Sequence, residues 1–375
     1  MAGLYIHIPF CESKCHYCNF YSTVSLKWKN EFVEALVKEM ELRRDYLAGD
    51  EIESIYYGGG TPSLLPENDL EKIHSAIYKH LKISEQPEIT IEANPDDLNR
   101  EKAVFLKSAG FNRLSIGTQA FDDDILSKLN RRHSARQSFT AIENAVAAGF
   151  DNIGIDFIFG IPGLSDELLE KETDLVTKLN ISHISAYHLT VEPKTALEVM
   201  IRKGKYPVPD EEQGARQFYL LSQRLSQAGF EHYEISNYAR GGRYSLHNSN
   251  YWRLKKYLGL GPSAHSFDIE SRQWNVSSVK SYCQNIFTGK PYFEKENLSL
   301  NDKFNEYVML SLRTNRGVDL TYINKVFGAE FSTLFAEKAA GKIAQGQMEV
   351  KEGRYLLSFK GMFFADGIAA DFFVD

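Results

Sequence analysis

The chain has 375 residues and a mass of 42.7 kDa, more than the roughly 250–300 residues that one hydrophobic core usually serves, so one large domain with smaller additions is expected. Hydrophobic residues make up 43% of the chain and charged residues 25%, a globular mixture that excludes a disordered or fibrous protein. The formal net charge of −7 is opposite in sign to that of a general nucleic-acid binder, so no nucleic-acid partner is expected.

Short strand-like runs alternate with amphipathic, helix-like stretches through the first half of the chain. The predicted strands are Leu4–Ile8, Ser54–Tyr57, Glu88–Ala93, Arg113–Gly117, Asn152–Phe157 and His183–Leu189. The predicted helices are Lys27–Leu47, Glu67–Leu81, Arg100–Ala109, Ala135–Ala148 and Asp166–Leu179. Such alternation predicts an α/β fold with parallel strands joined by crossover helices. Because six strands are fewer than the eight of a closed barrel, we expect an open, partial (β/α)6 barrel over residues 1–205.

The pattern changes after this point. Residues 206–300 begin with a proline-containing linker and the predicted helix Glu211–Ala228, and are expected to form a connecting segment. Residues 301–375 contain short helical patterns and then two strand-like runs around a Glu-Gly turn. The predicted elements of this part are Asp302–Arg313, Leu320–Phe327, Ser332–Gln345, Met348–Lys351 and Tyr355–Phe359. Helices followed by a hairpin predict a small C-terminal α+β domain of the winged-helix kind.

Three of the four cysteines, Cys11, Cys15 and Cys18, follow the first predicted strand with the spacing Cx3Cx2C. Three cysteines this close in a chain without a disulfide scaffold indicate a metal or redox site. One interpretation is structural zinc with His7 or His16 as the fourth ligand. The favoured interpretation is an iron–sulfur cluster held by three thiolates, because zinc ligands usually come as two separated pairs and no second pair is present.

Glycine-rich or polar segments follow the next predicted strands. Tyr57–Pro62, with the sequence YGGGTP, comes after the second strand, and its glycines permit close approach of a ligand to the backbone. Glu92 ends the third strand, and Gln119, Arg131 and Asp156 lie at or beyond the fourth and fifth. Taken singly, each would be read as solvated or salt-bridged. Their shared place at the carboxyl ends of barrel strands predicts a binding site.

Together these motifs resemble the radical S-adenosylmethionine (SAM) superfamily. The tyrosine directly before the last cysteine of the motif, Tyr17 before Cys18, is part of the resemblance. The resemblance implies a radical-SAM barrel with a [4Fe–4S] cluster on the three cysteines. Three protein ligands leave one iron open, and SAM chelates that iron through its amine and carboxylate. Tyr17 is accordingly counted among the cofactor-binding residues.

The resemblance extends over nearly the whole chain to the oxygen-independent coproporphyrinogen III oxidase group. It is carried by the motifs at His7–Cys11, Gly58–Pro62, Ile116–Phe121 and Asp156–Pro162. By this resemblance, the residues that hold the cluster-bound SAM are Tyr5, Gly59, Gly60, Thr61 and Glu92. The residues that match positions at a second SAM of the true oxidase are Gln119, Arg131 and Asp156.

Two branches of this group differ in function. The true oxidase removes two propionate carboxyls from coproporphyrinogen, whereas HemW-type proteins are haem chaperones. Three features favour the HemW-type branch: Phe20 stands where the oxidase pattern Cx3Cx2CxC has a further cysteine, the first strand begins by Leu4 without a long extension, and His247–Trp252 matches the signature HNxxYW. The resemblance implies a chaperone without oxidase activity, and no catalytic residue is assigned. The oxidase, and a radical enzyme with another substrate, are the alternatives.

The HNxxYW signature implies a haem site. By this resemblance its haem-binding residues are His247, Asn248, Tyr251 and Trp252. Histidine is a common axial ligand of haem iron, and aromatic side chains pack against porphyrin faces. His265 and His188 are rival iron ligands. The segment Arg240–Lys256 carries five cations and no acid, which suits haem propionates or an anionic membrane surface.

The expected partners are haem as cargo and acceptor haemoproteins, among them membrane-bound respiratory enzymes. The N-terminal residues MAGLYIHIPF lack the basic region and apolar core of a signal peptide, and no apolar run has the length of a transmembrane helix. We therefore expect a cytoplasmic protein that contacts the membrane peripherally in use. The sequence leaves open whether the chain forms a homodimer.

Overall fold

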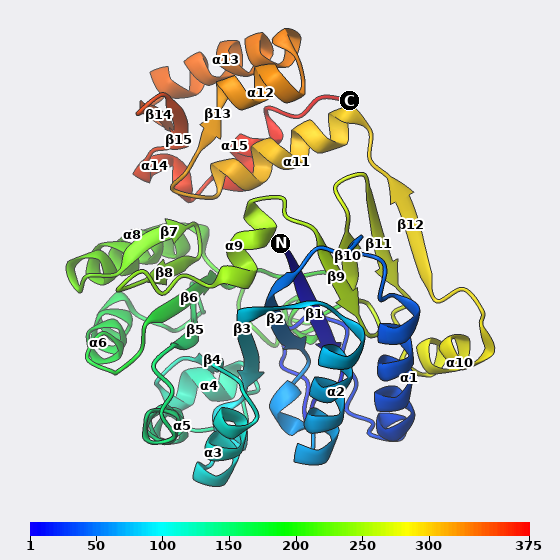
Figure 1. The fold of residues 1–375 in the computed structure, drawn as a ribbon. Coiled ribbons are helices and arrows are strands. Elements are labelled where there is room, and N and C mark those ends of the chain that lie inside the picture. Colours follow the sequence, from blue (N-terminus) through cyan, green and yellow to red (C-terminus); the bar gives the residue numbers. More distant parts are fainter.

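The computed structural model describes residues 1–375 and contains one large sheet of twelve strands with a small domain beside it (Figure 1). Six parallel strands in chain order form the centre of the sheet. They are β1 (Ala2–Ile8), β2 (Ile52–Gly59), β3 (Ile83–Ala93), β4 (Arg113–Gln119), β5 (Ile153–Phe159) and β6 (His183–His188). This arrangement confirms the predicted α/β fold with a parallel sheet, and each predicted strand is present.

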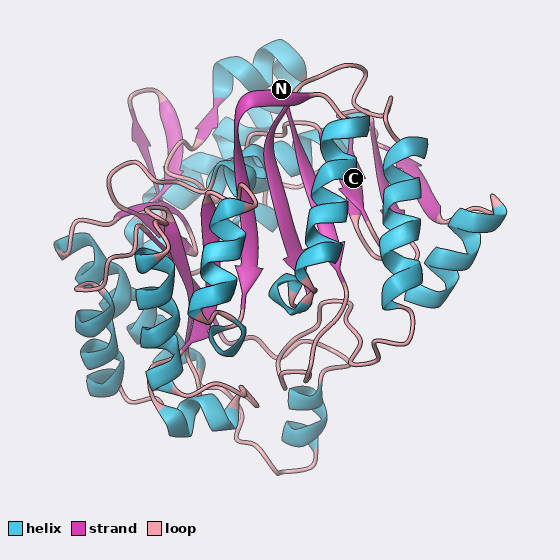
Figure 2. Cartoon of the chain, turned by 60° about the horizontal axis from the view of Figure 1, so that its bottom comes forward, coloured by secondary structure: helices cyan, strands magenta, loops and turns pink.

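Helices cover the outer face of these strands, side by side (Figure 2). The long ones are α1 (Lys29–Leu42), α2 (Glu67–His80), α3 (Arg100–Ser108), α5 (Ala135–Ala147), α6 (Asp166–Val176) and α8 (Glu211–Gln227). The sequence predicted all six. It did not predict α4 (Asp123–Lys128), α7 (Ala196–Arg202), η1 (Pro62–Leu64) or η2 (Pro95–Asp97), which are too short for an apolar period to show.

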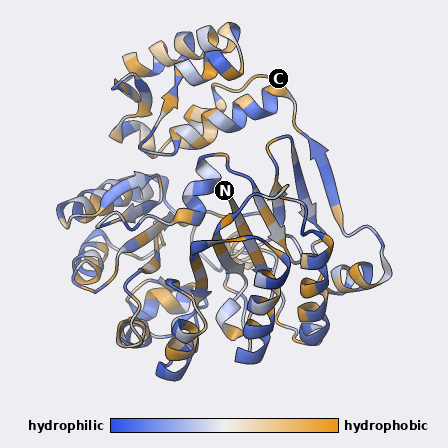
Figure 3. Cartoon of the chain, in the orientation of Figure 1, coloured by the Kyte–Doolittle hydropathy of each residue, from blue (hydrophilic) through white to orange (hydrophobic).

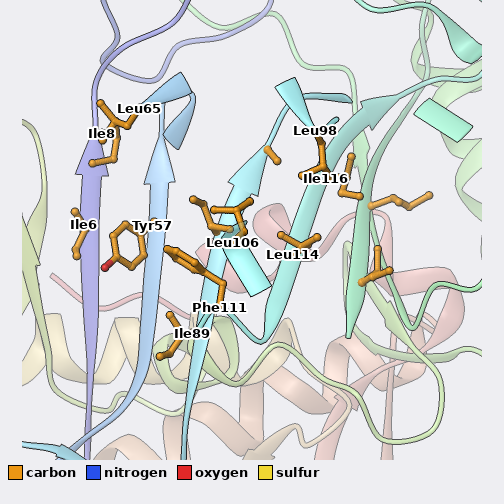
Figure 4. Packing of buried hydrophobic residues seen from close by; sticks show 14 of the residues in the cluster. Ile6, Ile8, Tyr57, Leu65, Ile89, Leu98, Leu106, Phe111, Leu114 and Ile116 are labelled. Atoms are coloured by element: carbon orange, nitrogen blue, oxygen red, sulfur yellow. The ribbon is translucent and has the colours of Figure 1, made fainter. Parts of the chain in front are cut away.

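The main core lies between the strands and these helices. Ile6 and Tyr57 from the first two strands, and Leu114 from the fourth, meet Leu106 and Phe111 from the helix side (Figure 4). The rings of Tyr57 and Phe111 pack edge to face, with their centroids 5.1 Å apart. Strands that are apolar on the outer face leave the inner face and the carboxyl ends of the barrel for polar side chains.

Residues 206–300, expected as a connecting segment, extend the sheet at both edges. β7 (Glu231–Glu234) and β8 (Asn237–Ala239) join antiparallel beside β6. β9 (Tyr257–Leu260) pairs with β1 in parallel. The strands that follow it are β10 (His265–Phe267), β11 (Ser271–Asn275) and β12 (Phe293–Asn297). Because most of these strands have only three to five residues, no alternating pattern identifies them in the sequence.

The outermost strand, β12, is exposed along its whole length, and Figure 3 shows that most of it is hydrophilic. Its sequence is FEKEN, so charged side chains occupy the open sheet edge. Charges on an edge strand oppose pairing with another chain. Two further helices belong to this part of the chain, α9 (Leu246–Trp252) and α10 (Val279–Thr288).

The C-terminal domain has a core of its own, centred on Phe304, Phe335 and Phe372 and separate from the main core. Its helices are α11 (Leu300–Leu312), α12 (Leu320–Val326), α13 (Ala329–Ala344), α14 (Phe359–Met362) and α15 (Ala365–Ala370). Its antiparallel sheet contains β13 (Val318–Asp319), β14 (Met348–Lys351) and β15 (Arg354–Leu357). The predicted small α+β domain with a hairpin is confirmed, but two short helices that were not predicted, α14 and α15, follow the hairpin.

Ion pairs and aromatic contacts join the two parts. Arg313 of the C-terminal domain pairs at 3.0 Å with Glu234, which is buried at the end of β7. Phe363 packs on Phe218 of α8, with ring centroids 5.7 Å apart. The short helix α9 lies between the sheet and α11 (Figure 1). None of the helices combines the length and the apolarity that crossing a bilayer requires.

Candidate functional site

A cavity of about 420 Å³ opens at the carboxyl ends of the central strands and collects the predicted cluster and SAM residues. Those lining it are Tyr5, Cys11, Cys15, Tyr17, Cys18, Gly59, Gly60, Thr61, Glu92, Gln119, Arg131 and Asp156. The four residues of the HNxxYW signature are not among its walls. The predicted site residues therefore lie in two separate places in the fold.

The three cysteines of the loop after β1 are free thiols, each partly exposed toward this cavity. Thr61 Oγ1 donates to Cys11 Sγ at 3.6 Å, and Arg131 Nη1 donates to Cys15 Sγ at 3.3 Å. Burial raises the pKa of the Cys11 and Cys18 thiols. Thiolates in this loop therefore depend on positive charge, which Arg131 supplies and the iron of a cluster would supply.

The alternative zinc site is not favoured by the geometry. No group of three or more histidine, cysteine or carboxylate side chains is arranged to hold a single metal ion. His7 is already engaged: its Nε2 donates to the Tyr21 carbonyl at 2.9 Å, and its Nδ1 accepts from the Tyr5 hydroxyl at 3.1 Å. His16 Nδ1 donates to the Lys128 carbonyl at 3.2 Å. Three spaced thiols without a fourth side-chain ligand fit a cluster with one open iron.

The glycine run after β2 is drawn tightly against the cysteine loop. The backbone N–H of Gly60 donates to the Ile8 carbonyl at 2.7 Å, and that of Thr61 donates to the Phe10 carbonyl at 2.7 Å. A Cβ at residue 60 would lie 2.7 Å from the Phe10 oxygen, so only glycine fits there. Gly59 has a φ of 111°, a conformation that side-chain-bearing residues rarely adopt. The run therefore exposes backbone to a ligand in the cavity.

Two half-buried carboxyl groups face the same cavity. Glu92 accepts from the Gly59 N–H at 3.2 Å and from the Tyr56 hydroxyl at 2.8 Å. Burial, with Asp156 nearby, raises the pKa of Glu92 to about 7. Burial also raises the pKa of Asp156 to about 6, although Ser115 donates to it at 3.4 Å. A cationic ligand would stabilise both ionised carboxylates, which suits the ammonium and sulfonium groups of SAM.

Several residues of this site were not predicted. Arg113 is 1% exposed inside the barrel, and its charge lowers the pKa of both of these carboxyl groups against the larger effect of burial. Asn94 accepts from Arg131 Nη2 at 2.8 Å and donates to Thr61 Oγ1 at 3.3 Å, so it links the arginine to the glycine run. An arginine at the start of an otherwise apolar strand was the one signal available for Arg113.

His247 and Tyr251 of the HNxxYW signature lie on the barrel floor. We use this term for the amino-terminal ends of β1 and β2, which lie beneath α9. His247 is 1% exposed, with Ser54 Oγ 3.0 Å from its Nδ1 and the Tyr251 hydroxyl 2.8 Å from its Nε2. Its ring stacks on Tyr56 at a centroid distance of 5.1 Å. Burial, with Arg113 adding, lowers the pKa of His247 to about 3. Coordination of iron by His247 would require α9 to leave the floor.

The rest of the signature points elsewhere. Trp252 lines a second cavity, of about 400 Å³, between α9 and the C-terminal domain. Asn248 is half-buried, and its backbone N–H donates to Ser245 at the start of α9. Of the rival iron ligands, His265 is exposed on β10. His188 lines the first cavity, but its Nε2 is buried against Gly214 without a hydrogen-bond partner.

The residues present fit the implied cofactors. Cys11, Cys15 and Cys18 would hold a [4Fe–4S] cluster, and the glycine run with Glu92 would receive the amine of SAM. A cluster of this kind, when reduced, supplies the electron that cleaves the SAM sulfonium bond. The protein side chains orient the ligand and balance its charge.

Comparison with known proteins agrees with this site. The Radical SAM superfamily matches residues 5–176, and the HemN C-terminal domain matches residues 298–364. The chain is 36% identical over 364 residues to the heme chaperone HemW of Bacillus subtilis, covering 96% of each protein. It is 33% identical to the heme chaperone HemW of Mycobacterium tuberculosis strain H37Rv, covering 98% of this chain and 93% of the relative.

Among solved structures, coproporphyrinogen III oxidase (HemN) from Escherichia coli, a radical SAM enzyme, superimposes with a TM-score of 0.86. The alignment covers 100% of this chain and 90% of that one at 24% identity, and therefore shows a shared fold. The cysteine loop, the glycine run and the near full-length similarity to the chaperones lead to one assignment: the chain belongs to the HemW family of radical SAM proteins.

Proposed function

We propose that this protein is a haem chaperone, which binds haem and delivers it to acceptor haemoproteins while carrying a SAM-ligated [4Fe–4S] cluster. The observation that carries the proposal is the near full-length similarity to proteins named heme chaperone HemW. Phe20 supports it, because a 65% exposed aromatic side chain stands where the oxidase pattern has a further cysteine.

The signature HNxxYW serves haem binding in two ways in this proposal. His247 holds α9 on the barrel floor through its hydrogen bond to Ser54 and its stacking on Tyr56, and the Tyr251 hydroxyl fixes the orientation of its ring. Trp252 lines the cavity on the other side of α9, and Asn248 belongs to the same helix. The helix is thus a support for the haem site, and its histidine acts by positioning.

The proposed acceptors are haemoproteins that include membrane-bound respiratory enzymes, reached from the cytoplasm. The cations of Arg240–Lys256 do not form the membrane-facing patch expected from the sequence. Three of them are paired, Arg243 with Asp151, Lys255 with Glu53 and Lys256 with Asp50. Arg240 donates to backbone carbonyls and has no counterion. Arg253 makes no ion pair either.

Two measurements on one anaerobic, cluster-reconstituted sample test the proposal. Product analysis with SAM, a reductant and coproporphyrinogen III is expected to yield no protoporphyrinogen, with a genuine oxidase as positive control. Haem titration is expected to give a saturable Soret change, and the loaded protein is expected to restore activity to an apo-haemoprotein. Appearance of protoporphyrinogen would make the protein an oxidase, and failure to bind haem would end the chaperone assignment.

A further inference from the structure

The cavity between α9 and the C-terminal domain is not used by the cluster or by SAM. It lies at the opposite end of the barrel strands from the cysteine loop, because α9 packs on the amino-terminal ends of β1 and β2. Its volume of about 400 Å³ lies within the range of small-molecule sites. Both domains contribute to its lining, so the site exists only when the C-terminal domain is docked.

Aromatic side chains form the two walls of this interdomain cavity. On the barrel side, Tyr233 lies against Tyr244 and Trp252, with ring centroids 4.6 Å and 5.7 Å away. On the C-terminal side, Tyr307 and Tyr322 stack on each other at 4.5 Å. Aromatic walls contributed by two domains suit a flat, largely apolar ligand.

Three arginines stand around the same cavity, and they come from three distant parts of the chain. Arg253 follows α9, Arg316 precedes β13, and Arg354 begins β15. Arg253 and Arg316 make no ion pair. Arg354 forms an ion pair at 3.3 Å with Asp319, which is the only acidic residue in the lining. Burial lowers the pKa of Arg316, and the charges of Arg253 and Arg354 lower it further, so the three guanidinium groups repel one another.

Such a concentration of unbalanced positive charge is unusual in a chain whose net charge is −7. Guanidinium groups that repel each other are stabilised by an anion placed among them, and their planar geometry suits carboxylates. The lining contains no histidine, cysteine or methionine. A ligand held here would therefore be bound through its face and its acidic edge, without a histidine, cysteine or methionine ligand to its iron.

We propose that the interdomain cavity is the haem site, in which Arg253, Arg316 and Arg354 bind the propionates and the tyrosine and tryptophan walls hold the porphyrin face. This proposal rests on the proposed function, since it assigns a place to the haem that a chaperone must carry. Weak, non-histidine retention of the iron suits a protein that must give its haem away.

The test compares haem with haem dimethyl ester, whose propionates carry no charge. Wild-type protein, Arg253→Gln, Arg316→Gln and the double variant are titrated with each ligand, followed by the Soret band. Loss of one exposed ion pair is expected to weaken haem binding about fivefold, and loss of two about twentyfold. Binding of the ester is expected to be unchanged across the series, and the advantage of haem over the ester is expected to be smallest in the double variant, where only Arg354 remains.

Two further variants complete the design. Arg44→Gln removes an arginine whose side chain is 60% exposed after α1, and it should leave both ligands unaffected. Tyr322→Ala removes part of a wall and should weaken haem and ester by the same factor. Thermal unfolding of each variant checks that its fold is intact.

The outcomes separate this inference from the proposed function. Equal wild-type affinity for haem and ester, or unchanged haem affinity in the double variant, would overturn the site while leaving a chaperone that binds haem elsewhere. A wild-type protein that binds no haem would overturn both. Displacement of haem by millimolar ATP with the same arginine dependence would assign the cavity to nucleotides, and it too would overturn the proposal.

Discussion

Replacement of His247 by alanine distinguishes a structural histidine from an iron ligand. The substitution removes a buried ring that stacks on Tyr56, and it removes one hydrogen bond each from the hydroxyls of Ser54 and Tyr251. Each lost hydrogen bond costs about 1 kcal/mol, and the aromatic contact about 1 kcal/mol more. With the cavity left behind, the free energy of unfolding should fall by about 3–4 kcal/mol at pH 8.

The pH dependence provides a second, independent signature. The pKa of His247 is about 3 in the folded protein, below the ordinary value of 6.5. As the pH falls, the unfolded chain therefore binds this proton before the folded protein does. The contribution of His247 to wild-type stability is fully present above pH 6.5 and is lost as the pH falls. At pH 5 this loss amounts to about 2 kcal/mol, which the alanine variant does not suffer. The difference between the two proteins should thus shrink to about half of its value at pH 8.

Urea unfolding of both proteins at pH 8 and pH 5, under anaerobic conditions, measures these differences. His265→Ala is the matched control, because that histidine is exposed and its removal should change the unfolding free energy by less than about 0.5 kcal/mol. If His247→Ala were as stable as wild type at pH 8, with no change in the difference at pH 5, the ring would not be the buried support described here.

Three other predictions concern the first cavity. Cys15→Ser should lose the visible absorption of the iron–sulfur cluster, and retained absorption with full iron content would refute the cluster assignment. Glu92→Gln should weaken SAM binding about tenfold or more in equilibrium dialysis, because a charge-assisted contact is lost. Glu172→Gln is its matched control, since burial raises the pKa of that carboxyl to about 7 as well, away from the cavity; equal losses in the two variants would refute a specific role. Phe20→Cys should leave cluster content and product analysis unchanged, and the appearance of decarboxylated porphyrinogen would contradict the branch assignment.

The sequence predicted the parallel half of the fold because its signals are local. The central strands are short runs rich in β-branched and aromatic residues that alternate with amphipathic helices, and the ends of these strands carry recognisable motifs such as the glycine run at Gly58–Pro62. The six strands β7–β12 escaped prediction for a physical reason. They are short, and partners distant in the chain stabilise them, as when β9 pairs with β1 across some 250 residues of sequence.

The candidate site divides in the same way. The cysteines follow β1 and Glu92 lies at the end of β3, where position in the sequence implies position in the barrel, whereas Asp156 lies in the middle of β5. The buried state of His247 could not be predicted, because it depends on Ser54 and Tyr56 from another strand. The convergence of Arg253, Arg316 and Arg354 depends on how the C-terminal domain docks, which no local pattern records.

Tyr56 contacts both the helix α9 and the cofactor side of the barrel. Its ring lies on His247, and its hydroxyl donates to Glu92, the carboxylate beside the glycine run. One rigid side chain therefore spans the barrel interior from α9 to the cofactor side. Thermodynamic reciprocity then requires that any movement of α9 that alters the affinity for SAM is matched by an equal change in affinity for whatever binds against α9. A ligand that displaced α9 on binding would therefore change the affinity at both ends of the barrel.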